Sequence, residues 1–330
     1  MIKRENYIAA KKLIDGSKRI MISGHLSPDG DSLGSMLALS RMISGEERQA
    51  FAVADPNQLG RLRFLEGVDG IVPLKKLKRQ RFDLLIAVDC TSVDRLPPEV
   101  RPFAEKLPVL CIDHHVTNTG FADVSIVDAA ASSAGELVWR FAKWNEWKLD
   151  RPVAEALWVA MITDSGRFAY DSTSSATLRA AGDIIKHGVR TSFINDVIYG
   201  TFSRKSIELK RLAWRSLTVW KNRKVAEVSL TRDDFRSVRG TKAEAEDIIE
   251  IPRSVDGNEI ALFFYQIPDR TRETRCSIRT RGDWDATVLA GKFGGGGHVR
   301  AAGCTIKSSM GGAKRMMRAA VRDMIKSQGR

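Results

Sequence analysis

The chain has 330 residues, of which 43% are hydrophobic and 28% charged, and its formal net charge is +13. This length exceeds the size at which one hydrophobic core usually stops growing, so we expect two domains. The composition is that of a globular protein and excludes a disordered one. The sequence contains no run of about 18 apolar residues and therefore predicts no membrane span.

The positive charge is unevenly distributed. Residues 1–200 contain 26 Lys and Arg against 25 Asp and Glu, whereas residues 201–330 contain 27 against 15. A basic second half indicates either attraction to a polyanion or a solvated basic surface.

The cysteines and the N-terminus indicate the compartment. Cys90, Cys111, Cys276 and Cys304 form no C-x-x-C pair and stand in or beside apolar runs, which favours buried free thiols. The first residues lack the apolar stretch and small-residue cleavage site of a secretory signal. We therefore expect a cytoplasmic protein.

The first half of the chain alternates apolar strand-like runs with helical patterns. Strands are predicted at 20–24, 84–88 and 109–112, and helices at 31–42, 134–144 and 153–162. Fully apolar strands separated by helices predict a parallel sheet covered on both faces. The expected fold class is therefore α/β, with a doubly wound N-terminal domain.

The second half predicts a smaller C-terminal α/β domain. Its strands are expected at 225–230, 259–265 and 274–279, with helices at 243–251 and from 311 onward. The segment between the two patterns mixes charged and apolar positions and predicts a helical connection. We expect domains at 1–191 and 223–330 with a helical linker at 192–222.

The first polar motif is Gly24-His-Leu-Ser-Pro-Asp-Gly-Asp-Ser-Leu-Gly34, between a predicted strand and a helix. Ligands of open α/β sheets bind outside the carboxyl ends of the strands. His25, Asp29 and Asp31 are therefore candidate metal ligands. The alternative is an Asp-rich turn that caps the helix.

Two further motifs follow apolar strands. Asp89 ends the strand 84–88, and Asp113-His114-His115 ends the strand 109–112. A lone Asp at a strand end is often a loop cap, but beside the first motif Asp89 could bridge two metals. Imidazoles suit Mn, Fe, Co or Zn, and carboxylates suit Mg or Mn.

Asp164 follows the apolar helix 153–162 and is another candidate oxygen ligand, and Arg167 is a candidate phosphate contact. The alternative for Asp164 is a turn residue. Together the motifs supply at least four carboxylates and at least two imidazoles without a thiol, which favours Mn²⁺ before Mg²⁺ over structural zinc. Two such ions activate a bridging water for phosphoryl displacement.

A glycine-rich run lies near the C-terminus, at Gly291-Lys-Phe-Gly-Gly-Gly-Gly-His-Val-Arg-Ala-Ala-Gly303. Consecutive glycines let backbone N–H groups approach an anion. The run lacks the Gly-Lys-Ser/Thr ending of a Walker loop, and a flexible linker is the alternative. Arg279 is a second candidate anion contact. Phe168, Trp284 and Phe293 could stack on a base, with core packing as the alternative.

These motifs in this order resemble the DHH phosphoesterase superfamily. The resemblance rests on His25-x-x-x-Asp29-x-Asp31, Asp89, Asp113-His-His115 and Asp164. The Gly-Gly-Gly-Gly-His-x-x-Ala-Ala-Gly run resembles the associated DHHA1 domain. The resemblance covers nearly the whole chain.

The resemblance implies a role for each motif residue. His25, Asp29 and Asp89 would hold one Mn²⁺. The second Mn²⁺ would be held by Asp31, Asp89, His114 and Asp164, and Mg²⁺ or Co²⁺ could substitute for either Mn²⁺. Three residues would act in catalysis: Asp89 as the bridge, His115 toward the substrate phosphate, and Asp113 as the residue that orients both histidines. The residues implied to bind substrate are Arg279, Gly295, Gly296, Gly297 and His298.

The compact two-domain size resembles the nano-RNase branch, which hydrolyses short oligoribonucleotides and 3'-phosphoadenosine-5'-phosphate. Cyclic dinucleotide (c-di-AMP) phosphodiesterases have a similar layout and are the alternative. Ser165 stands at a position where many relatives have Thr, and Thr280 stands at one where many have Ser. A non-catalytic nucleic-acid-binding protein would have lost metal ligands, and an inorganic pyrophosphatase would lack the glycine-histidine run. The expected partner is short single-stranded RNA or a nucleotide; the sequence leaves a homodimer open.

Overall fold

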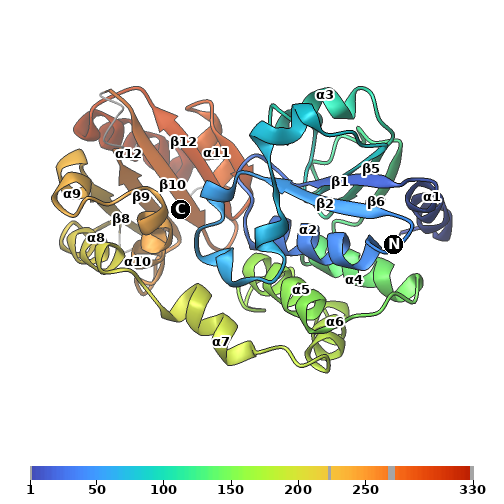
Figure 1. Cartoon of the computed structure of the whole chain (residues 1–330). Helices are drawn as coiled ribbons and strands as arrows, with labels where there is room; N and C mark the ends of the chain where they lie inside the picture. Colours follow the sequence, from blue (N-terminus) through green and yellow to red (C-terminus); the bar gives the residue numbers. More distant parts are fainter. Residues whose placement is uncertain (1, 222–223, 267–271, 328–330) are drawn as a thin grey trace. The chain divides into compact units, whose positions relative to one another are not determined.

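The computed structural model describes residues 2–221, 224–266 and 272–327. The chain divides into two compact units, with the boundary between Gly200 and Thr201 (Figure 1). The described helices include none that is long and apolar enough to cross a membrane.

Unit 1 is built on a six-stranded parallel sheet. Its strands are β1 (Arg19–Ser23), β2 (Gln49–Ala54), β3 (Val72–Pro73), β4 (Leu84–Val88), β5 (Val109–Asp113) and β6 (Val124–Val127). The strand order is β3-β2-β1-β4-β5-β6, and every neighbouring pair is parallel. The order reverses between β1 and β4, which confirms the predicted doubly wound fold.

Helices and turns cover both faces of this sheet (Figure 1). The helices of unit 1 are α1 (Arg4–Asp15), α2 (Gly30–Ile43), α3 (Arg101–Ala104), α4 (Ala134–Trp144), α5 (Arg151–Asp164), α6 (Ser175–Ile185) and α7 (Thr191–Asn195). The larger core lies under α2, α4 and α5, and a smaller one lies on the other face, where Leu77 and Val100 are buried. The two cores explain why the strands are apolar on both sides.

Close packing of α2 against α5 determines where two polar motifs meet. A Cβ atom on Gly34 would lie 2.3 Å from the carbonyl oxygen of Ala156, and one on Gly30 would lie 2.4 Å from Thr163 Oγ1. The two backbones therefore approach to a distance that only glycine allows. The beginning of α2 consequently lies against the end of α5, which carries Asp164.

Unit 2 contains a mixed six-stranded sheet. Its strands are β7 (Thr218–Trp220), β8 (Val225–Leu230), β9 (Ile260–Tyr265), β10 (Thr274–Thr280), β11 (Gly296–His298) and β12 (Ala301–Ile306). The order is β11-β12-β10-β9-β8-β7; β8 and β9 are parallel, and the other pairs are antiparallel.

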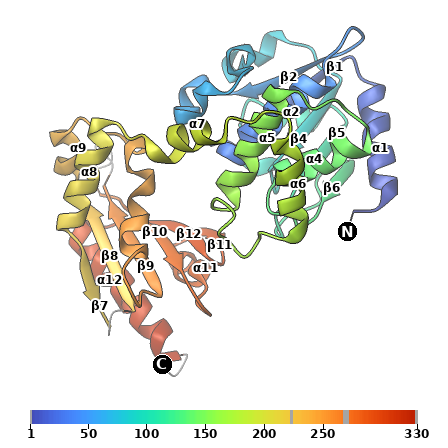
Figure 2. The same ribbon diagram turned by 90° about the horizontal axis from the view of Figure 1, so that it is seen from below.

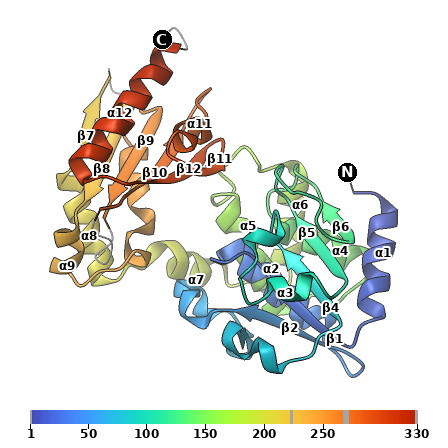
Figure 3. The same cartoon turned by 90° about the horizontal axis from the view of Figure 1, so that it is seen from above.

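Alternate residues of the central strand β9 face two separate cores of unit 2. Leu262 and Phe264 pack on the side of α11 and α12, whereas Phe263 and Tyr265 pack on the side of α8 and α10. Figures 2 and 3 show α12 on one face of this sheet and α8 on the other. The helices are α8 (Arg204–Arg215), α9 (Arg232–Ser237), α10 (Glu250–Arg253), α11 (Ala286–Gly291) and α12 (Met310–Ser327). This confirms a smaller C-terminal α/β domain.

Two expected helical segments differ from the structure. Ala243–Ile249 is a 3₁₀ helix and only Glu250–Arg253 is α-helical, because apolar spacing over two turns does not separate the two hydrogen-bonding patterns. The segment 192–222 contains α7 and α8 but also β7, which pairs with β8 at the sheet edge. The four cysteines are buried free thiols, as expected.

Candidate metal centre

Three of the polar motifs meet where the strand order reverses. The His25 loop follows β1, Asp89 follows β4, and Asp113-His114-His115 ends and follows β5. Carboxyl ends of parallel strands lie at one edge of the sheet, and the reversal point opens a crevice there. The topology thus brings residues from three strand ends together.

Asp29 and Asp31 occupy the beginning of α2 in different environments. Asp29 is the N-cap; its Oδ1 accepts a hydrogen bond from Ser32 N–H (3.1 Å), and its side chain is 58% exposed. Asp31 is fully buried, and its two oxygens accept hydrogen bonds from the backbone N–H groups of Ala134 (2.7 Å) and Gly135 (2.8 Å). Asp29 is thus both the helix cap and a candidate ligand, whereas Asp31 is a buried candidate ligand within the first turn of the helix.

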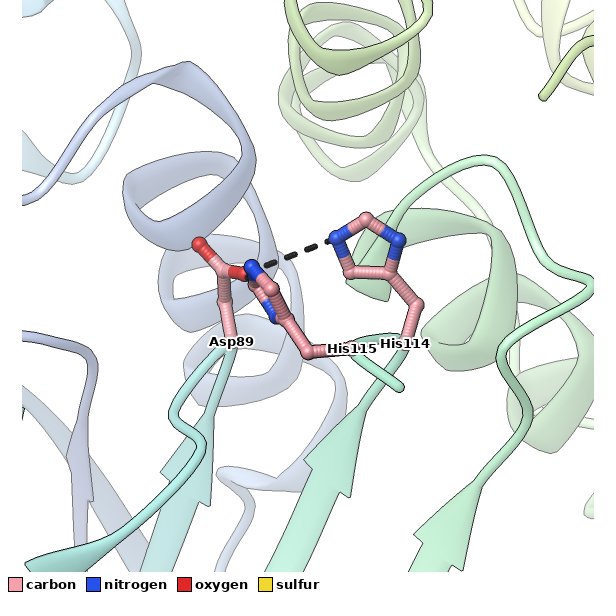
Figure 4. Close-up of side chains that lie close together, drawn as sticks. All are labelled: Asp89, His114 and His115. Carbon is pink, nitrogen blue, oxygen red and sulfur yellow. Dashed lines mark ion pairs between the residues drawn. The ribbon is translucent and has the colours of Figure 1, made fainter. Parts of the chain in front are cut away.

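Asp89 is held in an unusual backbone conformation. Its φ is +52°, in the left-handed region that an Asp adopts at a local cost. Its Oδ2 lies 3.4 Å from His25 Nε2, and its Oδ1 lies 3.7 Å from His114 Nε2. The turn therefore aims the two oxygens of one carboxylate at two different histidines; Figure 4 shows Asp89 beyond its strand with the His114 and His115 rings beside it.

Among the described residues, three groups of side chains have the spacing to hold a cation. Within each group the donor atoms lie within 4.8 Å of one another. The groups are His25, Asp29 and Asp89; Asp31, His114 and Asp164; and Asp89, His114 and His115. Every predicted metal-ligand residue belongs to at least one of these groups.

The His114 ring fits a metal ligand. Its Nδ1 lies 3.4 Å from the carbonyl oxygen of Ala131, which favours a proton on Nδ1 and leaves a lone pair on Nε2. Nε2 is buried and has no hydrogen bond within the described structure, although Asp164 Oδ2 lies 3.2 Å away. A buried polar atom without a hydrogen bond is costly unless a partner such as a cation occupies the site.

Asp113 organises the two histidines. Its Oδ1 accepts hydrogen bonds from His115 Nδ1 (2.7 Å) and His114 N–H (2.9 Å), and its Oδ2 accepts one from Asn118 Nδ2 (2.6 Å). Burial raises the pKa of Asp113, but these hydrogen bonds outweigh it, so the pKa is lowered. Asp113 is thus an ionised carboxylate that orients the two histidines and belongs to none of the three cation groups.

The electrostatics of the centre favour an added positive charge. Burial first, and then the neighbouring carboxylates Asp89 and Asp164, raise the pKa of Asp31 well above its usual value. Burial likewise raises the pKa of Asp164 to about 6, against the lowering effect of His114. Burial lowers the pKa of His25, but Asp29 and Asp89 outweigh it and raise the pKa to about 10. Buried carboxylates that repel one another are stabilised in their charged form by a bound cation.

A left-handed turn follows Asp164. Gly166, Arg167 and Phe168 have φ values of +59°, +62° and +63°. The Arg167 guanidinium lies over the Tyr199 ring, 4.9 Å from its centroid, and Phe168 packs edge-on against Trp158. The structure therefore places the predicted phosphate contact Arg167 on an aromatic ring and Phe168 in partly buried packing.

The predicted substrate residues of unit 2 lie on or beside the two strands that flank β12. Arg279 on β10 and His298 on β11 are both in register with Ala301 of β12, from opposite sides. The side chain of His298 lies outside the described structure, and its backbone ends β11. A Cβ on Gly295 would lie 2.2 Å from the carbonyl oxygen of Gly303, and one on Gly297, where φ is +144°, would lie 2.4 Å from that of Ala301.

A cavity of about 400 Å³ adjoins this glycine segment. Gly295, Gly296 and Phe293 line it together with Arg275 and Ser277, whereas Gly297 and Arg279 do not appear in its lining. Trp284 is only 1% exposed and donates a hydrogen bond to Glu259 (2.6 Å). Of the three candidate aromatic platforms, Trp284 is therefore a core residue, because no base could reach its ring.

Sequence reasoning missed several groups that hold the ligands. They are the carbonyl of Ala131, the N–H groups of Ala134 and Gly135, and the side chains of Asn118 and Glu136. The available signal was the Ser133-x-x-Glu136 spacing at the start of α4, which is typical of a helix N-terminus and hence of an anion-binding position.

Comparison with known families agrees with this geometry. Residues 19–161 match the DHH family, N-terminal domain, and residues 236–327 match the DHHA1 domain. The chain therefore belongs to the DHH/DHHA1 family and is a phosphoesterase hydrolase of a metal-dependent family.

Individual relatives share both domains. The chain is 27% identical over 296 residues to the bifunctional oligoribonuclease and PAP phosphatase NrnA of Bacillus subtilis (strain 168), covering 88% of this chain and 90% of that protein. The crystal structure of an exopolyphosphatase-related protein from Bacteroides fragilis superposes with a TM-score of 0.89 at 22% identity, over 98% of this chain and 97% of that one. The likeness to the Bacteroides fragilis structure supports the fold alone.

A more distant relative represents the alternative activity. The cyclic-di-AMP phosphodiesterase GdpP of Geobacillus thermodenitrificans (strain NG80-2) is 25% identical over 96% of this chain, which spans 49% of that protein. The lower identity and the partial span place this chain nearer to the oligoribonuclease relatives.

Proposed function

We propose that this chain is a Mn²⁺-dependent phosphoesterase that hydrolyses short oligoribonucleotides, 3'-phosphoadenosine-5'-phosphate, or both. The observation that carries the proposal is the position of Asp89, whose Oδ2 faces His25 and whose Oδ1 faces His114. A carboxylate that serves two ligand groups at once is the arrangement needed for two adjacent cations.

We assign the ligands to two sites. His25, Asp29 and Asp89 would hold one cation. The other would be held by Asp31, Asp89, His114 and Asp164, a set supported by the short distances among their donor atoms. Bound divalent cations lower the pKa of a coordinated water and neutralise charge on phosphoryl oxygens.

The remaining residues of the centre orient one another and the substrate. Asp113 accepts the Nδ1 proton of His115, so that His115 presents Nε2 as the atom that meets a substrate oxygen. Asn118 donates to the other oxygen of Asp113 and keeps this carboxylate from rotating. We therefore assign His115 to the substrate phosphate and Asp113 to its orientation.

The donor chemistry favours Mn²⁺. The groups with cation spacing in the described part of the chain contain carboxylate oxygens and imidazole nitrogens and no thiol. The nearby Cys90 is buried, which raises its pKa to about 12 and keeps its thiol protonated. Mixed oxygen and nitrogen donors suit Mn²⁺, and Mg²⁺ or Co²⁺ are the natural substitutes.

Unit 2 contributes the substrate contacts in this proposal. We assign them to Arg279, Gly295, Gly296, Gly297 and His298, supported by the pairing of β10 and β11 with the same strand β12 and by the basic composition of residues 201–330. Short polyanions require cationic and N–H donor groups more than base readout. We place catalysis in residues 1–191, a linker at 192–222 and substrate binding in 223–330.

The proposal is tested by incubating the purified protein with Mn²⁺ and three substrates in parallel. These are an RNA of two to five nucleotides, 3'-phosphoadenosine-5'-phosphate and cyclic di-AMP, with products separated by chromatography. Hydrolysis of the first two in preference to the third is the expected result. EDTA-treated protein is the control and should show no turnover.

Each other outcome contradicts a different part of the proposed function. Preference for cyclic di-AMP would make the chain a signalling phosphodiesterase. If Mn²⁺ is bound but no substrate is turned over, the metal site remains supported and the substrate class is refuted. Turnover that survives EDTA would refute the metal assignment. The four free thiols favour a cytoplasmic location, which fractionation would test.

A further inference from the structure

One loop reaches two ligands of the same candidate site. We call residues 128–135, which run from the end of β6 into the first turn of α4, the clamp loop. Its Ala131 carbonyl lies 3.4 Å from His114 Nδ1, and its Ala134 and Gly135 N–H groups donate to the two oxygens of Asp31 at 2.7 and 2.8 Å. The clamp loop therefore orients both an imidazole and a carboxylate through backbone groups alone.

A buried glutamate holds the clamp loop in place. Glu136 is 0% exposed, and its Oε2 accepts hydrogen bonds from Ser132 N–H (3.0 Å), Ser132 Oγ (2.8 Å) and Thr177 Oγ1 (2.8 Å). Ser133, the N-cap of α4, accepts from the Glu136 N–H at 3.0 Å. Ser132 and Ser133 immediately precede the N–H donors Ala134 and Gly135. Both are therefore hydrogen-bonded to Glu136, Ser132 to its carboxylate and Ser133 to its backbone N–H.

A second attachment holds the beginning of the clamp loop. Arg140 forms ion pairs with Glu136 Oε1 and with Asp128 Oδ2, the latter at 3.0 Å. Asp128 in turn accepts hydrogen bonds from Ala130 N–H (3.2 Å) and, through its carbonyl, from Ala131 N–H (3.0 Å). The Ala131 carbonyl that faces His114 is thus positioned by the same ionic network.

The other candidate site differs in the described structure: its Asp29 accepts a hydrogen bond from the Ser32 N–H of its own helix and not from the clamp loop. His25, Asp29 and Asp89 contact one another, with His25 Nε2 3.7 Å from Asp29 Oδ2 and 3.4 Å from Asp89 Oδ2. The Asp29 side chain is 58% exposed and that of Asp31 only 1%. Within the described residues, the hydrogen bonds from the clamp loop to a carboxylate ligand go to Asp31 and not to Asp29.

We propose that Glu136 is a positioning residue that, through the clamp loop, holds the cation site of Asp31, His114 and Asp164 in its binding geometry and leaves the site of His25 and Asp29 largely unaffected. This inference rests on the proposed two-cation centre. The two sites therefore differ in how they are built, one pre-formed by a buried network and the other open at its exposed carboxylate.

The expected effect follows from how outer residues act on metal ligands. Residues that orient ligands contribute typically about 10- to 100-fold in metal affinity. In Glu136→Gln the side chain keeps its size and one carbonyl oxygen but loses the charge that pairs with Arg140. We expect Mn²⁺ affinity to fall about tenfold or more at one site and to change less than about twofold at the other.

The experiment isolates each site before Glu136 is changed. His25→Ala removes a ligand from the open site, and Asp164→Ala removes one from the clamped site, so each variant retains one site intact. Glu136→Gln is then added to each background and to the otherwise unchanged full-length chain. Mn²⁺ binding is measured by electron paramagnetic resonance titration of free Mn²⁺ and by calorimetry, without any substrate.

Glu136→Gln should weaken Mn²⁺ binding in the His25→Ala background and leave it unchanged in the Asp164→Ala background. Equal weakening in both backgrounds, or none in the His25→Ala background, would overturn the inference while the proposed function stands. If the unchanged chain bound no Mn²⁺, the proposed function itself would fail. In that chain, Glu136→Gln should lower the affinity of one Mn²⁺ of two.

Two further variants separate positioning from loss of folding. Glu155→Gln is the matched control. Glu155 is also buried in a helix and forms an ion pair with an arginine, Arg190, at 2.7 Å. It lies in the first half of α5, whereas Asp164 is the last residue of that helix. This control variant should leave both Mn²⁺ affinities unchanged. If Glu136→Gln fails to fold by circular dichroism, Arg140→Met removes the outer ion pairs and should weaken the same site selectively. An equal effect of Arg140→Met on both sites would overturn the inference.

Discussion

The centre of unit 1 and the glycine segment of unit 2 use different parts of the polypeptide. In unit 1, side chains at the ends of parallel strands converge, and buried carboxylates such as Asp31 face imidazoles such as His114. In unit 2, Gly295 and Gly297 bring backbone so close to β12 that a Cβ would collide with it. A cation centre needs charge at defined points, whereas a surface for a flexible anion needs accessible N–H groups.

This difference explains why the net charge does not show where the chemistry lies. The basic excess lies in residues 201–330, but the candidate ligands lie in the nearly neutral first 200 residues. In unit 1 the acidic side chains would be neutralised by cations. Changes in unit 1 should therefore abolish catalysis, and changes in unit 2 should alter stability or substrate affinity.

The largest expected effect is that of Asp89→Ala. Removing the carboxylate that faces His25 and His114 should lower kcat/KM by about 10³-fold or more, because both cations lose a ligand. Steady-state kinetics with short RNA and circular dichroism measure activity and fold. Activity above about 10% of wild type would contradict the bridging role.

Asp83→Asn is the control for this prediction, because Asp83 precedes β4 and Asp89 follows it. Asp83 is exposed and accepts hydrogen bonds from the Lys18 and Arg19 N–H groups at 2.8 and 3.0 Å. It lies at the opposite end of the strand from the centre. Its variant should keep kcat/KM within about twofold of wild type.

The second prediction concerns Mn²⁺ binding to the protein without substrate. At a free Mn²⁺ concentration of 100 Kd, one site should stabilise unit 1 by about 2.7 kcal/mol, since the cation binds only the folded state. Hydrogen exchange should slow in peptides around Asp31, Asp89 and His114 and remain unchanged in β11 and β12. Equal slowing in both units would contradict a centre confined to unit 1.

The smallest effect separates two neighbouring glycines. Gly297→Ala should lower the free energy of unfolding of unit 2 by about 2 kcal/mol, because its φ of +144° and its contact with the Ala301 carbonyl both exclude a Cβ. Gly296→Ala, where a Cβ would meet no atom within 4 Å, should change it by less than about 0.5 kcal/mol. Urea unfolding followed by tryptophan fluorescence measures both, and equal values would contradict the packing described here.

Much of unit 1 could be predicted because its local signals agree. β4 and β5 are buried at every residue and apolar up to Asp113, and the polar motifs begin where these apolar runs end. Other strands were missed: β2 begins with the exposed Gln49, and edge strand β6 buries only Ile126 fully. Short or half-exposed strands resemble loops in sequence, because their pairing depends on neighbours distant in the chain.

The sequence by itself determined the ligand types and their position after strands, because carboxylates, imidazoles and apolar runs are properties of side chains. Only the tertiary structure decided that Asp31 is held by the Ala134 and Gly135 N–H groups and that Ala131 faces His114. Every residue carries a carbonyl and nearly every one an N–H, so no residue type marks which of them will face a ligand. Their roles appear only once the clamp loop is folded against Glu136.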